Sequence, residues 1–590
     1  MSNSPATPRS QLSRAAVCAI AVALGVAGTA TAEVTQVVPG ITYERVARPG
    51  QVIHVVRVVQ GPLVSIHPVL TGGSPSQRGR LTDAMRARLG DGAVVGVNGD
   101  YFNLDNAYPS GLLMVGGELV SEPEPTRSAL LFPSSGPLLT AKVQLAGTWQ
   151  ASDPANPTTT YPPRTFIGVN RPAEQADETI VYTPRYGTLT PIGDRVDALI
   201  ALDPPGLPTI NTPLTGTVQA ISQGGGSGVG PGKLVLSGVG RAGDKVLADL
   251  DAPNRRVTIN FAIPGIPAGL TDAIGGGPTL VQDGVAIPGV SEGFTPGQIG
   301  AHTSRTAIGQ MADGTVLLVT TEGPLQSSRG MSMAELADLM VSLGARTAVG
   351  MDGGGSAVMS LRDALVTPWA SERAISDAVV VSYGGVQLSQ PAAFISPNGD
   401  GVDERTRTTA RAPTNGTVRI TLARRNGRAV KMLYAGPLGP AGRQITLAQS
   451  TLRVKDGRYR VIARFVPSDG SGPTTHSHDV TVDRTLGFLH LRKVGQQPAT
   501  KLRIGFTLAK ATRATIVVKN AKGGSVKLIF RNHRIRAGSW AVTWDLRRAG
   551  KPLKPGIYTV SVRVRTAQGE PALSARVRVT APKRPAVPAA

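Results

Sequence analysis

Short runs of β-branched and other apolar residues, separated by turns rich in glycine, proline and aspartate, fill the chain from Glu33 to about residue 385. Runs of this length, bounded by turn residues, predict β-strands. The clearest are Val52–Val59, Ala93–Val97, Val257–Phe261 and Thr315–Thr320. We expect short strands to make up most of this region.

Two segments have a helical pattern instead. Leu81–Leu89 is rich in arginine and alanine, and in Ser332–Leu343 the apolar residues recur three or four positions apart. Ser332 and Glu335 stand at the spacing of a capping box, which marks the first turn of a helix. A strand over Arg346–Met351 follows the second helix. The expectation is therefore an α+β domain of mixed β-sheets with few helices, followed by two all-β sandwiches.

The pattern changes after residue 387 and then repeats. Thr417–Leu433 matches Ala514–Ile529, and Gly457–Val461 matches Gly556–Val560, about 100 residues further along. Two copies of one β-sandwich are predicted. The expected boundaries are 33–387 for the larger domain, 203–260 for an insertion or subdomain within it, 388–484 and 485–581 for the sandwiches, and 582–590 for a disordered basic tail.

The first 32 residues have the features of a signal peptide. Arg9 and Arg14 precede an apolar stretch over Ala15–Ala27, and Ala30-Thr31-Ala32 is an A-x-A cleavage site. The stretch is too short for a transmembrane anchor, and no later segment is long enough. We expect a secreted or cell-wall-associated protein. The only cysteine, Cys18, lies in this leader, which excludes disulfides and cysteine nucleophiles from the mature chain.

Positive charge is concentrated in the C-terminal third. Residues 388–590 hold 37 Lys and Arg against 9 Asp and Glu, whereas the preceding residues hold 25 against 30. On an exported protein, a region with a net charge of +28 favours anionic partners such as cell-wall polymers. Aromatic residues do not interleave with these cations as they do in nucleic-acid-binding motifs, so nucleic acid is not an expected partner.

Residues 349–358, Val-Gly-Met-Asp-Gly-Gly-Gly-Ser-Ala-Val, place Asp352 between an apolar segment and three glycines. Successive glycines are kept where bare backbone approaches a ligand or adopts positive φ. Further turns that carry polar residues after apolar strands are Asn98–Phe102, Pro109–Gly111, Gly275–Pro278, Ser304–Ala307 and Thr321–Gly323. This pattern predicts a functional site built from loops at strand ends.

In this order the segments resemble the phosphodiester glycosidase family, typified by the mannose-6-phosphate uncovering enzyme, an N-acetylglucosamine-1-phosphodiester alpha-N-acetylglucosaminidase. The segments that carry the resemblance are Asn98–Phe102, Gly275–Gly284, Arg305–Gly309, Asp352–Ser356 and Glu372-Arg373. Two positions depart from the family pattern. Pro324 stands where an arginine is frequent, and Asp377 stands where an asparagine is usual. The resemblance implies hydrolysis of a sugar–phosphate linkage, with no cofactor required.

Breaking the bond between an anomeric carbon and a phosphate oxygen needs a carboxylate beside the oxocarbenium-like centre and cations for the phosphate. On the resemblance, Asp352 is the carboxylate nearest the anomeric centre, as nucleophile or base. Asp100 and Glu322 are candidates for the other acid–base role, and Arg305 holds the phosphate with Arg373 second. The expected ligands of sugar hydroxyls and phosphate oxygens are Asn98, Ser356 and the backbone of Gly275, Gly276, Gly277, Gly353, Gly354 and Gly355.

Structural alternatives stay open for three of these residues. Arg305 can pair with Glu322, the Glu372-Arg373 pair can stabilise the fold, and Asp100 can bind a cation.

A separate candidate is the turn Asn398–Glu404, where oxygen-bearing side chains alternate round glycines.

In that turn Asp400 and Asp403 are candidate calcium ligands, although the twelve-residue EF-hand pattern is absent. The alternative is an acidic turn without a metal. The repeats around it resemble the Ig-like domain of the flagellar hook-capping protein, a type of module that accompanies exported bacterial enzymes.

Three functions are compatible with the sequence. The first is an exported glycosidase that hydrolyses a glycosyl-1-phosphodiester in envelope or extracellular polysaccharide, held near anionic wall polymers by basic Ig-like modules. The second is a non-catalytic glycan-binding or exopolysaccharide-assembly surface protein. The third is an ordinary glycoside hydrolase on the same fold.

Overall fold

The computed structural model describes residues 31–580, except 135, 188, 253, 288–291, 326–327, 370, 390 and 496–499. The expected leader up to residue 30, with Cys18, and the expected tail at 582–590 lie outside the described residues. Among the helices that are described, none combines the length and apolar character needed to cross a lipid bilayer.

The structure is almost entirely β, so the expected α+β class is wrong. Strands make up 52% of it and helices 8%. Helices form at the two predicted places, as α1 (Leu81–Ala87) and α4 (Met333–Ser342). The other helical segments are α2 (Arg241–Leu250), α3 (Pro296–Gly300), α5 (Gln449–Leu452) and 3-10 turns at Pro184–Tyr186 and Gly354–Ser356. The β-branched, glycine-rich sequence between the helices lacks their period, and it pairs into sheets instead.

Two sheets packed face to face form the sandwich around Asp352. One has the strand order β1 (Thr31–Val38), β2 (Ile41–Arg48), β3 (Gln51–Val58), β22 (Val316–Thr321), β21 (Arg305–Met311), β23 (Ala345–Met351), β19 (Thr279–Gln282) and β20 (Val285–Ala286). The other has the order β25 (Ala364–Leu365), β24 (Met359–Leu361), β5 (Ala93–Asn98), β26 (Asp377–Tyr383) and β4 (Val64–Leu70). Both sheets contribute to one hydrophobic core.

Each outer face of this sandwich carries one of the predicted helices. Helix α4 packs Leu336 and Met340 against the first sheet, and α1 packs Leu81 and Met85 against the second. Ser332 caps α4 and forms the predicted capping box with Glu335. The helices therefore cover the sheets without adding to the layer that holds the site.

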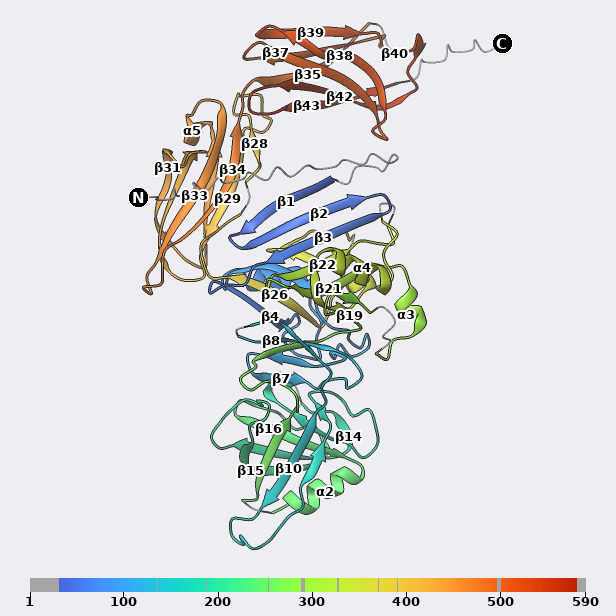
Figure 1. Cartoon of the computed structure of the whole chain (residues 1–590), viewed down its shortest axis with the longest axis vertical. Helices are drawn as coiled ribbons and strands as arrows, with labels where there is room; N and C mark the ends of the chain where they lie inside the picture. The colour runs from blue at the N-terminus through green and yellow to red at the C-terminus, as the bar shows by residue number, and fades with distance from the viewer. Residues whose placement is uncertain are drawn as a thin grey trace, which may run out of the picture.

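A third sheet connects the sandwich to the lower part of the molecule (Figure 1). Its order is β7 (Glu118–Ser121), β6 (Leu113–Val115), β18 (Asp272–Gly275), β8 (Ala129–Phe132) and β9 (Leu139–Ala141). Alternate residues of β8 enter different cores: Leu130 and Phe132 pack with the sandwich, and Ala129 and Leu131 pack with the next sheet. This sheet therefore lies between two hydrophobic cores.

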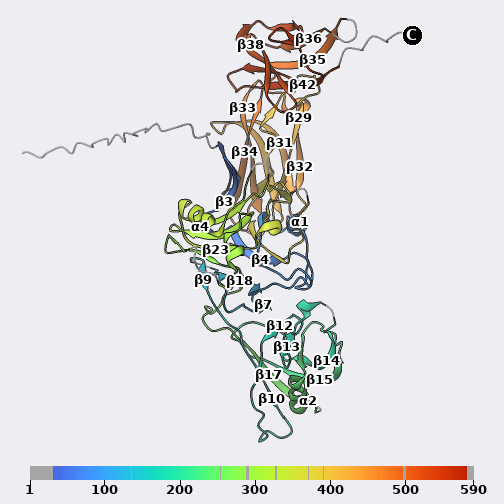
Figure 2. The same cartoon turned by 90° about the vertical axis from the view of Figure 1, so that its right-hand side faces the viewer.

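The fourth sheet forms one end of the elongated molecule, as both views show (Figures 1 and 2). Its order is β11 (Arg164–Phe166), β10 (Ala146–Ser152), β17 (Arg256–Ala262), β15 (Leu214–Gly225), β14 (Ile192–Leu202), β16 (Lys233–Val239), β13 (Thr179–Tyr182) and β12 (Gly168–Val169). Helix α2 packs against it. We call residues 146–262 the lower unit; it spans more of the chain than the 203–260 expected from sequence.

Two further β units follow the sandwich, and each has two sheets over one core. The first pairs β27 (Gln387–Leu388), β29 (Arg405–Arg411) and β32 (Arg443–Ala448) in one sheet, and β28 (Phe394–Ile395), β34 (Thr474–Val482), β33 (Gly457–Pro467), β30 (Gly416–Arg424) and β31 (Ala429–Leu438) in the other. The second unit, here called the terminal unit, has β35 (Leu486–Val494), β36 (Lys501–Leu508) and β39 (Gly538–Trp544) opposite β38 (Ser525–Ile535), β37 (Thr512–Asn520), β42 (Gly556–Arg565) and β43 (Ala572–Val579), with a small hairpin of β40 (Arg547–Arg548) and β41 (Lys551–Pro552).

The two units repeat the same strand pairing. The order β31-β30-β33-β34 in the first corresponds to β38-β37-β42-β43 in the second. The matching tyrosines also make the same contact: the Tyr459 hydroxyl donates to the Lys455 carbonyl at 2.7 Å, and the Tyr558 hydroxyl donates to the Lys554 carbonyl at 2.8 Å. The internal sequence match therefore corresponds to a matching arrangement of strands.

Candidate functional site

Four strands of the sandwich begin or end at the same edge. Strands β5 and β23 end there with Asn98 and Met351, while β21 and β26 begin there with Arg305 and Asp377. The register places Thr306 opposite Met351 and Ala378 opposite Asn98, so these antiparallel strands bring the four ends together. Most of the polar residues singled out in the sequence lie at this edge.

Asp352 follows the end of β23 and is half-buried. Its backbone N–H donates to the Gly99 carbonyl at 3.1 Å, and its Oδ1 accepts the Gly353 N–H at 2.8 Å. Burial raises the pKa of Asp352, and hydrogen bonding to Ser356 and the charges of Arg373 and Arg127 oppose that rise. The loop therefore fixes a carboxylate at the edge of the sandwich with cations nearby.

Asp100 lies two residues beyond the end of β5 and is almost fully buried. Its Oδ1 accepts the Tyr101 N–H at 2.7 Å, and Arg127 Nη1 lies 3.6 Å from the same oxygen. Its Oδ2 has no hydrogen-bond partner among the described residues. Burial raises the pKa of Asp100 to about 6, Arg127 opposes the rise, and the charge of Asp352 adds to it.

Asp377 is a third carboxylate at this edge, and sequence reasoning treated it only as a departure from the family pattern. Its Oδ1 accepts the Asp100 N–H at 2.8 Å, and its Oδ2 is also unpartnered within the described chain. Burial, then the charges of Asp100 and Asp352, raise the pKa of Asp377 well above its ordinary value. Three neighbouring carboxyl groups thus favour retention of a proton, and Asp377 favours it most. In the described part of the chain no group of three or more His, Cys, Asp or Glu residues has an arrangement that could hold a metal ion.

Asn98 uses its side chain to hold the site together. Its Nδ2 donates to the Asp352 carbonyl at 2.8 Å, and its Oδ1 accepts from the Thr306 hydroxyl at 2.7 Å and the Val358 N–H at 3.1 Å. The side chain is almost fully buried, and both its amide oxygen and its amide nitrogen are engaged with protein. The structure therefore places Asn98 behind the Asp352 loop as a positioning residue.

Arg305 contributes one free edge of its guanidinium. Its Nε donates to the Met331 carbonyl at 3.0 Å, and its Nη2 donates to the carbonyls of Gln298 and Ala301 at 2.8 and 2.7 Å. Its Nη1 faces the Asp352 loop: a Cβ on Gly353 would lie 3.5 Å from it. Among the described residues no ion pair joins Arg305 to Glu322, so the pairing considered from sequence is replaced by hydrogen bonds to three carbonyls.

Arg373 and Arg127 approach the carboxylates from other segments. Arg373 is exposed, and its Nη1 donates to the Ser356 hydroxyl at 3.3 Å. Its guanidinium lies against Gly355, where a Cβ would come within 2.7 Å of Nη2. Arg127 stacks over the rings of Tyr101 and Phe294, at 5.3 and 5.7 Å from their centroids. No sequence pattern pointed to Arg127.

The glycines allow these segments to approach closely. A Cβ on Gly275 would lie 2.3 Å from Asp100 Oδ2, and a Cβ on Gly276 would lie 2.6 Å from the Met351 side chain. Gly277 adopts a φ of 122° and donates its N–H to the Gly350 carbonyl at 2.8 Å. Gly354 also has positive φ, at 58°, and donates to the Ser304 carbonyl at 2.9 Å. Gly275 therefore brings bare backbone against the unpartnered oxygen of Asp100.

Glu322 and Glu372 do not join the carboxylates. Glu322 Oε1 lies 2.9 Å from His54 Nε2, whose Nδ1 contacts the Tyr43 hydroxyl at 2.8 Å. Both His54 and Glu322 are buried between β3 and the end of β22. Glu372 accepts the Thr82 N–H at 2.9 Å in the first turn of α1, and so is not paired with Arg373. Each has a structural contact of its own.

A cleft of about 1080 Å³ opens beside Arg127 and Tyr101. One wall comes from segments next to the carboxylates, including Tyr101, Arg127 and Phe294. The opposite wall comes from the lower unit, through Ile167 and the loop 171–175. Aromatic rings, amides and charged groups line this space, so it offers hydrogen-bond partners to a polar ligand.

The calcium candidate at Asn398–Glu404 is a turn satisfied by its own backbone. Asp400 accepts the N–H groups of Val402 and Phe488, each at 2.8 Å, and so ties the first C-terminal unit to the second. The Asp403 carbonyl accepts the Ser396 N–H at 2.8 Å. Calcium binding there stays a prediction.

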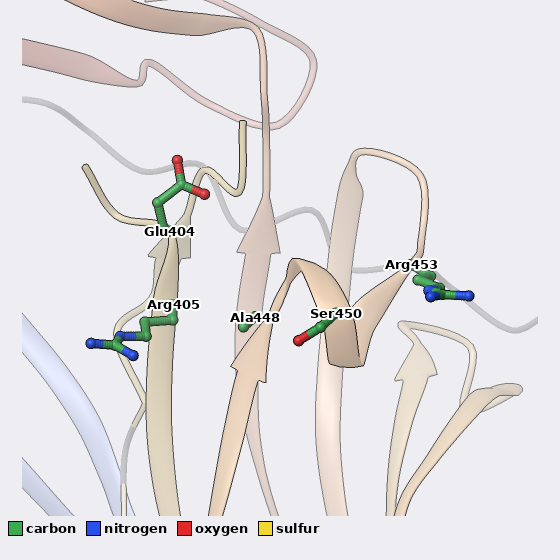
Figure 3. Close-up of a pocket in the computed structure, with 5 residues that line it drawn as sticks. All are labelled: Glu404, Arg405, Ala448, Ser450 and Arg453. Carbon is green, nitrogen blue, oxygen red and sulfur yellow. The ribbon is translucent and has the colours of Figure 1, made fainter. Parts of the chain in front are cut away.

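A shallow pocket of about 560 Å³ adjoins that turn. It is lined by Glu404, Arg405, Ala448, Ser450 and Arg453 (Figure 3). Figure 3 shows the side chains of Arg405 and Arg453 pointing away from each other. The pocket therefore lacks the convergent groups found at the sandwich edge.

Comparison with known proteins bears on the sandwich edge. Residues 210–382 match the phosphodiester glycosidase family. The matched stretch contains Gly275, Arg305, Asp352, Arg373 and Asp377. Asn98, Asp100 and Arg127 lie before it and join the site only through the fold.

Among curated proteins, the SPbeta prophage-derived uncharacterized protein YomE of Bacillus subtilis (strain 168) is 29% identical over 132 residues, which are 22% of this chain and 20% of that protein. The chain thus matches about a fifth of the length of this relative. Among solved structures, a hypothetical protein from Synechocystis has a TM-score of 0.49 at 20% identity, with 60% of this chain and 64% of that chain covered. The catalytic domain of zebrafish N-acetylglucosamine-1-phosphodiester alpha-N-acetylglucosaminidase, auto-inhibited by its pro-peptide, has a TM-score of 0.29 at 14% identity, with 60% and 88% covered.

Proposed function

We propose that this protein is a glycosidase that hydrolyses the linkage between an anomeric carbon and a phosphodiester. The observation that carries the proposal is the strand edge itself, where Asp352 and Asp100 meet beside bare glycine backbone and three arginines. The family match over residues 210–382 supports a hydrolase acting on phosphodiester-linked sugars.

In the proposed reaction the bond between C1 and the bridging phosphate oxygen breaks, and the phosphate leaves with the electron pair. Water supplies the oxygen that bonds to C1, and one of its protons passes to a carboxylate. Asp352 stabilises the positive charge at C1, as in other glycosidases. Asp100 takes the proton, because its unpartnered oxygen and a pKa near 6 suit a base at neutral pH.

Arginines are the natural partners of the departing phosphate. The free Nη1 edge of Arg305 and the exposed guanidinium of Arg373 flank the Asp352 loop from two sides. Charge-assisted hydrogen bonds from such groups stabilise the negative charge that grows on the leaving oxygen. The adjoining cleft then receives the rest of the substrate, which makes an envelope or extracellular polysaccharide a suitable source of the linkage.

The proposal extends to location. A leader in residues 1–32 would export the chain, and the two C-terminal units, as Ig-like modules, would hold it near anionic wall polymers. The equivalent tyrosine contacts of Tyr459 and Tyr558 support the Ig-like assignment, since a tyrosine that bonds back to the chain is a feature of that architecture. The positive charge of residues 388–590 supports the choice of partner.

The test is hydrolysis of a methyl diester of a sugar 1-phosphate, with release of reducing sugar as the readout. D352N is expected to lower kcat by at least about 1000-fold. The matched control is D283N, because Asp283 is 82% exposed and remote from the strand edge. A D352N protein that kept the wild-type rate would refute the assignment.

Two other outcomes would favour the rival functions. Turnover of aryl glycosides together with inert phosphodiesters would indicate an ordinary glycoside hydrolase. Binding of glycans without turnover of either substrate would indicate a surface or polysaccharide-assembly protein.

A further inference from the structure

The terminal unit carries three arginines in one line across its four-stranded sheet. Strand pairing places Arg513 of β37 directly opposite Arg534 of β38 on one side and Arg565 of β42 on the other. Directly paired residues of antiparallel strands share a face of the sheet. The neighbours Ala514, Ile535 and Val564 are buried in the core. The three arginines therefore project from the opposite, exposed face, and we call them the arginine row.

The arginine row has no acidic partner. None of the ion pairs found in the described residues includes Arg513, Arg534 or Arg565, although Arg563 on the same face pairs with Glu570 at 3.7 Å. All three side chains are exposed. Like charges directly opposite each other destabilise a sheet, so the unliganded row has a cost that an anion would relieve.

We infer that the arginine row is a binding site for a linear polymer of phosphodiester groups. Neighbouring strands lie about 4.8 Å apart, so the row places three guanidinium groups over about 10 Å. Arg513 Nη1 also donates to the Asn532 carbonyl at 3.2 Å, which leaves its other nitrogens for a ligand. A guanidinium matches the oxygens of a phosphate with two parallel hydrogen bonds, which an ammonium group cannot do. Beyond the row the same face carries the hydroxyl groups of Thr515, Ser561 and Thr559, which suit a polar chain laid along the sheet.

The arginine row does not depend on the proposed hydrolysis, and it deepens the proposed attachment of the C-terminal units to anionic wall polymers. The terminal unit lies at the end of the molecule opposite the lower unit (Figures 1 and 2), and none of its residues lies at the strand edge that holds Asp352. The row assigns the attraction of the basic C-terminal region for anions to three named residues. A failed binding test would therefore leave the hydrolysis experiment untouched, and the reverse also holds.

The experiment measures binding of the full chain to a fluorescent poly(glycerol phosphate) oligomer at several salt concentrations. The triple variant R513Q/R534Q/R565Q is expected to bind at least about 10-fold more weakly and to lose about two to three units of salt slope. The matched control is K519Q/K522Q/K527Q, which removes the same charge from the turn end of the β37–β38 hairpin. It is expected to change the affinity less than about threefold. Equal losses in the two variants would overturn the site, because they would reflect the general field of the unit.

Two further arms test the chemistry. The variant R513K/R534K/R565K keeps the charge and loses the forks, and it is expected to recover less than half of the lost binding free energy; full recovery would refute recognition by guanidinium geometry. A polygalacturonate of equal charge and anionic phospholipid vesicles are expected to bind more weakly than the phosphate polymer, and tighter binding of either would overturn the choice of ligand. An unfolding temperature of the glutamine variant at or above that of the wild type shows that weaker binding is not misfolding.

Discussion

Replacement of Asp100 by asparagine should make the sandwich more stable at neutral pH while it removes activity. Burial raises the folded-state pKa of Asp100 from 3.8 to about 6. A carboxyl group with a raised folded-state pKa holds its proton more tightly when folded, so its contribution to the free energy of unfolding falls as the pH rises from 3.8 to about 6. This rise in the pKa of Asp100 corresponds to about 3 kcal/mol of unfolding free energy.

The asparagine variant carries no charge at this position, so its free energy of unfolding does not fall in this way as the pH rises. Its amide oxygen can still accept the Tyr101 N–H, whereas Arg127 loses the carboxylate at 3.6 Å. The difference in free energy of unfolding, variant minus wild type, should therefore increase by about 3 kcal/mol between about pH 4 and pH 8. At about pH 4 Asp100 of the folded wild type is protonated, so the difference there reports only the replacement of a carboxyl group by an amide.

Hydrogen–deuterium exchange of the peptide that contains β5, followed through a urea series, measures this opening free energy for the sandwich without requiring the whole chain to unfold in one step. Hydrolysis of the phosphodiester substrate by D100N should fall at least about 100-fold. If the difference in free energy of unfolding stays constant across the pH range, or decreases as the pH rises, the pKa of Asp100 is not raised in the folded protein.

Three further substitutions separate the roles of the site residues. G275A places a Cβ 2.3 Å from Asp100 Oδ2, so it should displace that carboxylate and abolish hydrolysis. G300A, where a Cβ meets nothing within 4 Å, should keep the wild-type rate, and a wild-type rate for G275A would contradict the described packing. R373Q should raise KM for a phosphodiester with a change in unfolding free energy below about 0.5 kcal/mol, because Arg373 is exposed; an unchanged KM would remove it from phosphate binding. E322Q should keep kcat within about threefold and lower the free energy of unfolding by about 1–3 kcal/mol, since Glu322 contacts buried His54 at 2.9 Å. A large loss of kcat with an unchanged free energy of unfolding would restore Glu322 as an acid–base residue.

The sequence predicted helices and strands well where a single spacing of apolar residues dominated the segment. Helix α4 forms with the predicted Ser332–Glu335 capping box, and the following strand delivers Asp352. The overall class was wrong because two recognisable helices received too much weight beside many short strands. Strands of three or four residues, such as β6 and β18, have no detectable alternation, and only tertiary pairing defines them.

The motifs of the site could be predicted from the sequence, but the directions in which their side chains point could not. Asp352 and Asp100 come together because β5 and β23 end at one edge, which glycine-rich turns indicated. Glu322 also follows a strand, yet its side chain faces β3, and a single position in a turn does not specify which side it takes. Arg127 was missed because it reaches the site from a loop whose sequence has no motif.

The lower unit enters and leaves the fold through one pair of neighbouring strands. Ala146, the first residue of β10, is paired directly with Ala262, the last residue of β17. A paired position in an antiparallel sheet separates two Cα atoms by about 5 Å, a gap that a tight turn can close. The segment between these two residues can therefore be exchanged for another one that keeps Ala129 and Leu131 of the third sheet covered. Because it supplies only the far wall of the cleft, such an exchange would change what the cleft accepts while Asp100, Asp352 and Asp377 stay in place.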